Sequence, residues 1–255
     1  MSPDFVHLHT HSSYSPMWGT STLEALCEAV RSQGHDTFAL TDTNGLYGAI
    51  RFLEVAKRVG LKPILGTEII QAQHRAVLLA KSPEGYGNLC RLLSARHEDE
   101  PFEFIETIQR YRAGLVILSD DFQALTAWRA QSGEDLYVEL TPGADLQKAV
   151  SFSRQNCIPP VATTRAALLR PSDFEAHRLL RAIAENTTLS RLRPDCCCAP
   201  SHWLMPSSVM ARALPHVPEA LSNTRRIANQ CATAWDFQTT IFPSFREMSA
   251  DGAVA

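Results

Sequence analysis

The chain has 255 residues, of which 45% are hydrophobic and 20% charged, and its formal net charge is −3. This composition is typical of a globular protein with a sizeable core, and it excludes a disordered chain. No apolar run reaches the ~18 residues that span a bilayer, and residues 1–5 (MSPDF) lack the features of a signal peptide. We therefore expect a cytoplasmic protein with no membrane partner. The small net charge favours neither nucleic acid nor an anionic surface as a partner.

In chain order, short apolar segments alternate with amphipathic ones. Residues 21–24 (STLE) form a capping-box pattern that begins a helix, and this helix should end near Gly34. Strands are expected at residues 5–9, 37–41, 63–65, 76–80, 115–118, 136–140 and 160–163. Further helices are expected at residues 46–59, where Gly60 follows, and at 86–95, 103–111, 122–130 and 145–155. Because strands alternate with helices, the order predicts parallel pairing in an α/β barrel.

Beyond Pro171 the pattern changes. A helix is expected at residues 172–185, a loop at 186–206 and two helices at 207–214 and 218–231, with no clear element at 239–255. We place a boundary here, between a barrel domain at residues 1–186 and a helical extension at 187–255. The extension should pack around the barrel without closing it. A chain truncated after Glu185 should therefore still fold.

Seven cysteines are present. Four are isolated and are interpreted as small buried side chains in a reducing compartment: Cys27, Cys90, Cys157 and Cys231. The other three, Cys196 to Cys198, are adjacent, and adjacent thiols are unable to converge on one zinc ion. We interpret them as part of a surface loop that is prone to oxidation.

Chemically reactive side chains gather where the expected strands end. His7, His9 and His11 should share one face of a strand because side chains alternate, and imidazoles so placed are able to bind one metal ion. Glu68 follows another strand and offers an oxygen ligand, although a lone glutamate there is also common as a solvated loop residue. Asp42 follows a third strand, where it either orients an imidazole or caps the next helix.

These residues stand in longer motifs that resemble the PHP domain of bacterial DNA polymerase III alpha subunits. The matching segments are residues 5–12 (FVHLHTHS), 39–42 (ALTD), 46–49 (LYGA), 62–68 (KPILGTE), 85–89 (GYGNL) and 161–163 (VAT), followed by Asp173 and His177. The resemblance covers nearly the whole chain in order. It indicates the N-terminal PHP region of a C-family DNA polymerase, and leaves open whether the parent is replicative or error-prone.

The resemblance implies a distorted (β/α)7 PHP barrel that holds up to three divalent metal ions and, in intact members, cleaves phosphoesters or proofreads. Positions that match family ligands are His9, His11 and Glu68, with His97 less well aligned, and His7 and Asp42 would support them. Positions where a family ligand is replaced are Trp18, Thr43, Asp121, Arg165 and Ala167. The implied site is degenerate, with no catalytic residue assigned, and holds either no metal or one weakly bound zinc or manganese ion.

Arg165 follows the last expected strand of the barrel and brings a permanent positive charge to a position where the family has a ligand. We expect its guanidinium group to enter the pocket and to pair with Glu68 or Asp121. The alternative is that Arg165 points to solvent, as most surface arginines do.

Three functions stay open at this point. The first is a non-catalytic PHP domain that supports a polymerase module in a longer parent chain and docks a proofreading exonuclease subunit, with DNA reached through the polymerase. The second is an active metal-dependent phosphoesterase or 3′–5′ exonuclease, which the replaced ligands oppose. The third is a barrel that binds nucleic acid without chemistry. Since residues 241–245 are where the family continues toward its polymerase core, we expect a fragment of a polymerase rather than a short gene product.

Overall fold

The computed structural model describes residues 5–98, 101–143 and 145–237, so the segments expected at 239–255 and 241–245 lie outside it. Within the described residues six strands form one sheet in sequence order. The strands are β1 (Thr37–Leu40), β2 (Lys62–Gln71), β3 (His74–Ala80), β4 (Leu115–Ser119), β5 (Leu136–Leu140) and β6 (Pro160–Ala162). The helices are α1 (Leu23–Ser32), α2 (Ala49–Val59), α3 (Pro83–Glu98), α4 (Phe104–Tyr111), α5 (Phe122–Gln131), α6 (Leu146–Asn156), α7 (Phe174–Ala184), α8 (Ser207–Ala213) and α9 (Pro218–Gln230).

The sheet is mixed rather than all parallel. β1 pairs with β2, β4 with β5 and β5 with β6 in parallel, whereas β3 is antiparallel to both of its neighbours. The prediction of parallel pairing is therefore wrong at β3. The physical reason is the length of the connection, because only Ala72 and Gln73 separate β2 from β3. Parallel strands need a crossover of a dozen or more residues.

The N-terminal segment closes the sheet between its two edges. Ala39 N in β1 donates to His7 O at 2.8 Å, and Ala166 N, after β6, donates to His9 O at 3.0 Å. A parallel bridge also joins Thr10 to Ala166. Residues 5–11 thus lie where a seventh strand would stand, and the architecture is the mixed α/β, distorted barrel that the sequence predicts.

Residues 5–9 do not form the regular strand that the sequence predicts. Val6 and Leu8 join the buried cluster inside the barrel, while His7 points away from it and packs edge-on against Phe5. Strict alternation would send His9 outward with His7, yet its ring lies inside the barrel against two carboxylates. The prediction that His7 shares a face with His9 is therefore wrong, because the alternation breaks between Leu8 and His9.

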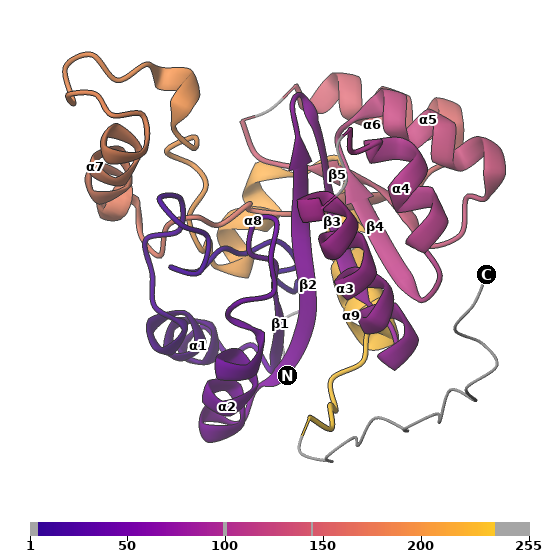
Figure 1. The fold of residues 1–255 in the computed structure, drawn as a ribbon, viewed down its shortest axis with the longest axis horizontal. Helices are drawn as coiled ribbons and strands as arrows, with labels where there is room; N and C mark the ends of the chain where they lie inside the picture. Colours follow the sequence, from indigo (N-terminus) through magenta and orange to yellow (C-terminus); the bar gives the residue numbers. More distant parts are fainter. Residues whose placement is uncertain (1–4, 99–100, 144, 238–255) are drawn as a thin grey trace, which may run out of the picture.

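Helices cover the outer face of the sheet in two groups (Figure 1). α1 and α2 pack over β1 and β2, with Phe38 and Phe52 in the shared cluster, and α3, α4 and α5 pack over β3 to β5 around Trp128. Gly60 has a φ of 72° and ends α2, as predicted, because a glycine adopts this left-handed conformation without strain. No helix in the described part of the chain is long and apolar enough to cross a membrane.

Helix α9 belongs to the core of the barrel. Ile227 and Cys231 lie in the same buried cluster as the inward-facing strand residues, and Thr224 Oγ1 accepts a hydrogen bond from Val6 N at 2.8 Å. The sequence predicts that the extension packs around the barrel without closing it. Helix α9 instead contributes side chains to the barrel core. The boundary after residue 186 stays a prediction about chain organisation, but the two parts share one core.

Replacing Ile227 with alanine should lower the free energy of unfolding by about 2–5 kcal/mol, because it leaves a cavity in this core. Asn229→Ala, on the exposed side of the same helix, is the matched control and should change the free energy by less than ~0.5 kcal/mol. Denaturant unfolding followed by circular dichroism measures both. For the same reason, a chain truncated after Glu185 should not melt cooperatively. A cooperative transition in the truncated chain would show that the barrel does not need α9.

His35 should make the fold sensitive to acid. It is buried, and burial, with the charge of Arg225, lowers its pKa from 6.5. Below pH 6.5 the unfolded chain therefore takes up a proton that the folded protein does not bind. The contribution of His35 to the free energy of unfolding is fully present above pH 6.5. As the pH falls below this value, the contribution decreases by up to ~1.4 kcal/mol per pH unit until the pKa of the folded state is reached. His35→Leu should remove this part of the pH dependence of urea unfolding, and an unchanged dependence would contradict the assignment.

Candidate metal centre

Three buried side chains converge at the carboxyl ends of the strands, namely His9, His11 and Glu68. The Nε2 atoms of His9 and His11 lie 3.1 Å apart. Glu68 Oε1 lies 3.3 Å from His9 Nε2, and Glu68 Oε2 lies 3.7 Å from His11 Nε2. In a tetrahedral site with bonds of ~2.0–2.1 Å, neighbouring ligand atoms are about 3.3 Å apart. The donor set therefore fits one zinc-sized ion.

Hydrogen bonds behind the cluster favour a proton on Nδ1 of both histidines, so that Nε2 is the ligand atom of each neutral imidazole. His9 Nδ1 donates to the Glu139 carboxylate at 2.6 Å, and His11 Nδ1 lies 3.2 Å from Ser15 Oγ. A proton held on Nδ1 leaves the lone pair of the imidazole on Nε2. Metal-binding histidines are commonly oriented in this way by a carboxylate or another acceptor behind them.

Asp42 acts on this cluster through Ser15. Its carboxylate accepts from Ser12 N at 2.7 Å, from Ser12 Oγ at 2.8 Å and from Ser15 Oγ at 2.7 Å. Since the Ser15 hydroxyl donates to Asp42, it is left to accept from His11 Nδ1. The residue that precedes α2 is Gly48, so Asp42 does not cap that helix. Burial raises the pKa of Asp42, and these hydrogen bonds oppose the rise.

The protonation states within the cluster depend on one another. Burial disfavours the ionised form of Glu68, but His11, His9 and Arg75 lower its pKa to about 2. Burial lowers the pKa of His11 to about 4. It acts in the same direction on His9, where Glu139 and Glu68 reverse the effect and raise the pKa. At neutral pH Glu68 is therefore a carboxylate and His11 a neutral imidazole, which are the forms that bind metals.

Two guanidinium groups lie beside the cluster. Arg165 Nε and Nη2 lie 3.0 and 2.7 Å from Glu139 Oε2, and Nη2 lies 2.8 Å from Asp120 Oδ2. Arg75 Nη2 donates to both oxygens of Asp120, at 2.9 and 3.0 Å, and its Nε lies 3.9 Å from Glu68 Oε1. Although burial alone would raise it, the Arg165 charge holds the pKa of Glu139 well below its ordinary value.

Arg165 enters the pocket, as the sequence predicts, but the predicted partners Glu68 and Asp121 are wrong. Asp121 caps α5 and pairs with His74 outside the pocket. Because successive residues of an extended chain face opposite sides, Asp120 points inward in its place. Arg165 also has a φ of 46°. This left-handed conformation is costly for arginine and persists only where the surrounding contacts hold it.

Of the other predicted positions, Thr43 lies in the pocket and His97 outside it. Thr43 Oγ1 donates to Glu68 Oε2 at 2.9 Å. His97 is exposed on α3, where its Nε2 lies 3.1 Å from the carbonyl oxygen of Asn44. The structure does not bring His97 to the cluster, because α3 packs on the outer face of the sheet.

His7, Trp18 and Ala167 contribute no ligand atom either. The ring of Trp18 packs edge-on against His177, with centroids 5.1 Å apart. Ala167 is buried and carries only a methyl group. The ring of His7 packs against the ring of His35. Burial lowers the pKa of His7 to about 3, and the charge of His35 acts in the same direction.

Four residues of the pocket and its surroundings are not predicted from the sequence, namely Glu139, Asp120, Arg75 and Ser15. Glu139 could have been predicted as a buried, paired residue, because it is the only charged residue in the apolar strand segment 136–140 (LYVEL). A charged side chain in a fully buried strand is rare unless it is paired. No feature of the sequence indicates the other three, since each lies in a loop or at a hairpin end where exposed polar residues are common.

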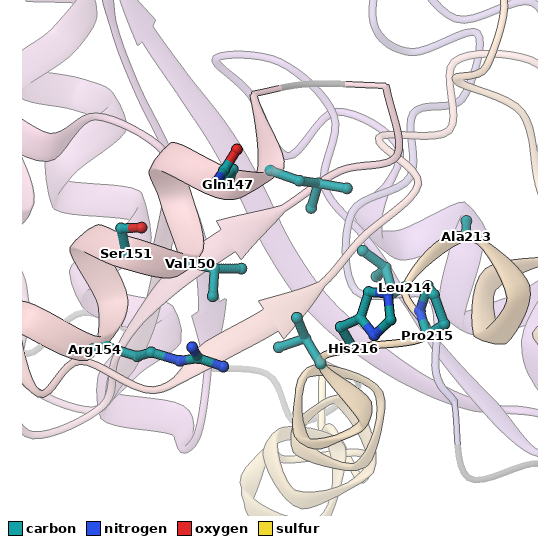
Figure 2. A pocket seen from close by; sticks show the side chains of 10 residues that line it. Gln147, Val150, Ser151, Arg154, Ala213, Leu214, Pro215 and His216 are labelled. Atoms are coloured by element: carbon teal, nitrogen blue, oxygen red, sulfur yellow. The ribbon is translucent and has the colours of Figure 1, made fainter.

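A separate hollow of about 410 Å³ lies between α6 and the turn that joins α8 to α9 (Figure 2). Leu146, Val150 and Leu214 contribute to its apolar lining, and Arg154 and His216 also line it. None of these residues belongs to the cluster, so the hollow is a different feature of the molecule.

Comparison with known proteins agrees with this arrangement. The family model of the PHP domain matches residues 7–140, which is more than half of the chain and includes His9, His11 and Glu68. The chain belongs to the PHP domain family. One of the solved structures to which the chain is similar is a two-domain protein from Bacteroides vulgatus that contains a predicted PHP-like metal-dependent phosphoesterase. It has a TM-score of 0.49 and 13% identity, over 88% of this chain and 66% of that chain.

Curated relatives of this PHP domain are DNA polymerases. The DNA polymerase III alpha subunit of Buchnera aphidicola subsp. Schizaphis graminum is 31% identical, over 89% of this chain and 23% of its own length. The error-prone DNA polymerase of Symbiobacterium thermophilum is 29% identical, over 95% of this chain and 26% of its own length. The chain therefore spans about a quarter of the length of the relatives it matches. It is homologous over most of its length to the N-terminal region of DNA polymerase III alpha subunits.

Arg165→Ala should lower the free energy of unfolding by ~3–5 kcal/mol, because it removes the guanidinium charge that balances the buried Glu139 carboxylate and contacts Asp120. Arg193→Ala is the matched control, since its pair with Asp195 is exposed and should contribute less than ~1 kcal/mol. Denaturant unfolding at neutral pH measures both losses. A loss for Arg165→Ala no larger than that of the control would show that the guanidinium group does not balance a buried charge.

Proposed function

We propose that this chain is the N-terminal PHP domain of a bacterial DNA polymerase of the DNA polymerase III alpha type, with a degenerate metal site and a structural role in DNA replication. The observation that carries the proposal is the binding of Arg165 and Arg75 to Glu139 and Asp120. Two-metal phosphoryl chemistry requires carboxylates that bind the ions and balance their charge. Here guanidinium groups already neutralise these carboxylates.

The groups left for a metal are His9, His11 and Glu68. A divalent ion bound there would act as a Lewis acid toward water or a phosphoryl oxygen. Three protein ligands are enough for one ion, and among the residues that the structure describes no nearby carboxylate remains unpaired to bridge a second. We therefore propose that the site holds at most one zinc or manganese ion, and that it holds this ion weakly.

As a domain of a longer chain, the barrel would support the polymerase module and reach DNA only through it. The names and lengths of the relatives support this proposal, because the chain corresponds to about a quarter of each polymerase. The partner that we propose for its outer surface is a proofreading exonuclease subunit. The compartment that we propose is the cytoplasm, where the DNA of a bacterium is replicated.

An active metal-dependent phosphoesterase or 3′–5′ exonuclease is the second candidate. The spacing of His9, His11 and Glu68 favours it, because three protein ligands and one open position are also the arrangement of catalytic zinc sites. The buried pairs of Arg165 oppose it, since a guanidinium group occupies the part of the pocket where another ion would bind.

Metal analysis and a hydrolysis assay separate the two candidates. The purified chain should contain at most one zinc or manganese ion. Neither metal should stimulate hydrolysis of a generic phosphoester or of single-stranded DNA, and His9→Ala should leave the background rate unchanged. Two or more tightly bound ions per chain, or metal-stimulated hydrolysis that His9→Ala abolishes, would overturn the structural role in favour of the phosphoesterase.

A further inference from the structure

The backbone of His202, in the segment between α7 and α8, contacts the chain that follows β6. This segment begins far from the sheet and returns to it (orange in Figure 1). The carbonyl oxygen of His202 accepts from Ala167 N at 3.0 Å and from Leu168 N at 3.1 Å. A bridge also joins Leu168 to Trp203, the residue after His202. The backbone at His202 is therefore held against the chain that follows β6.

That part of the chain also holds the two ligand histidines. Ala166 N donates to His9 O at 3.0 Å, and His11 N donates to Ala166 O at 2.8 Å. Ala166 thus binds the segment of His9 and His11, and the next residue, Ala167, binds His202.

The electrostatic surroundings of His202 agree with this position. Burial, and after it the charges of Arg165, His9 and Arg75, lower its pKa to about 3. The imidazole of His202 is therefore neutral at physiological pH, which is the form that binds a metal ion. Within the residues that the structure describes, no hydrogen bond reaches either ring nitrogen of His202. The ring is thus not committed to another partner.

We propose that His202 is the fourth protein ligand of a single zinc ion bound by His9, His11 and Glu68. The inference rests on the proposed one-metal site and extends it. The ring of His202 lies outside the three-residue cluster in this structure. The proposal requires its imidazole to turn toward the ion while the backbone stays bound to Ala167. Three imidazole nitrogens and a carboxylate oxygen are ligand types that zinc accepts in tetrahedral geometry.

A fourth protein ligand changes what the ion does. Structural zinc sites are closed by four protein ligands, whereas catalytic sites keep one position open for water. With His202 bound, the ion has no water to activate, which agrees with a domain that does not hydrolyse phosphoesters. The ion also connects the barrel to the segment between α7 and α8, so zinc binding stabilises the folded chain.

The test of this proposal compares the zinc affinities of three proteins. They are the 255-residue chain, His202→Ala and the control His216→Ala. His216 is exposed and lines the separate hollow of Figure 2. Metal-free protein is titrated with zinc against a chromophoric chelator, and with cobalt(II), whose visible absorption reports its ligands. The chain and His216→Ala should bind one zinc ion. His202→Ala should bind zinc at least ~10-fold more weakly and shift the cobalt(II) absorption, because water replaces an imidazole.

Thermal unfolding supplies a second measurement. Zinc should raise the Tm of the chain and of His216→Ala equally, and that of His202→Ala less, because stabilisation by a ligand follows its affinity. His202→Gln gives the same comparison if the alanine variant does not fold without metal.

Equal zinc affinity and equal Tm shifts for the chain and the His202 variants would overturn the inference. So would failure of the unsubstituted chain to bind zinc. Both outcomes leave the structural role of the domain intact, because that role is tested separately by metal-stimulated hydrolysis.

Discussion

The interior of this barrel depends on one buried carboxylate, that of Glu139. It accepts hydrogen bonds from His9, Arg165 and Thr163. Keeping a buried carboxylate charged is costly without such partners, so they are a condition for its presence. The contact with His9 places the proton on Nδ1 and turns Nε2 toward the cluster. The contact with Arg165 helps to hold a backbone conformation that arginine rarely adopts. One side chain thus connects the metal-binding side of the pocket to its cationic side.

A guanidinium group and a metal ion solve the same electrostatic problem in different ways. Both neutralise buried carboxylates, but a guanidinium group has no open coordination position and is unable to activate water. Arg165 and Arg75 therefore stabilise Glu139 and Asp120 while removing them from metal chemistry. Helix α9 further stabilises the barrel, because its side chains complete the core that the strands line on the inside. Both features support the proposed structural role of the domain.

Local signals allowed much of the fold to be predicted. Helix α1 begins within the predicted segment 21–24, although its cap is Thr22 and not the first residue of the capping-box pattern, and Gly60 ends α2 as predicted. Caps and amphipathic periodicity depend on neighbouring residues only. The predictions that failed all involve distant residues or breaks in periodicity. The direction of β3 depends on which strands lie beside it. The orientation of His7 depends on a break in alternation that no residue type announces.

By itself the sequence determined the family and the order of the elements, and it pointed to His9, His11 and Glu68 as a candidate metal site, since short motifs carry all of these. Only the tertiary structure decided which charges meet. It paired Arg165 with Asp120 rather than with Asp121, and it joined the backbone of His202, from beyond α7, to Ala167 and Leu168. The physical reason is that the direction of a side chain changes with each residue and at each backbone irregularity. A shift of one position therefore decides whether a charge lies inside the barrel or outside it.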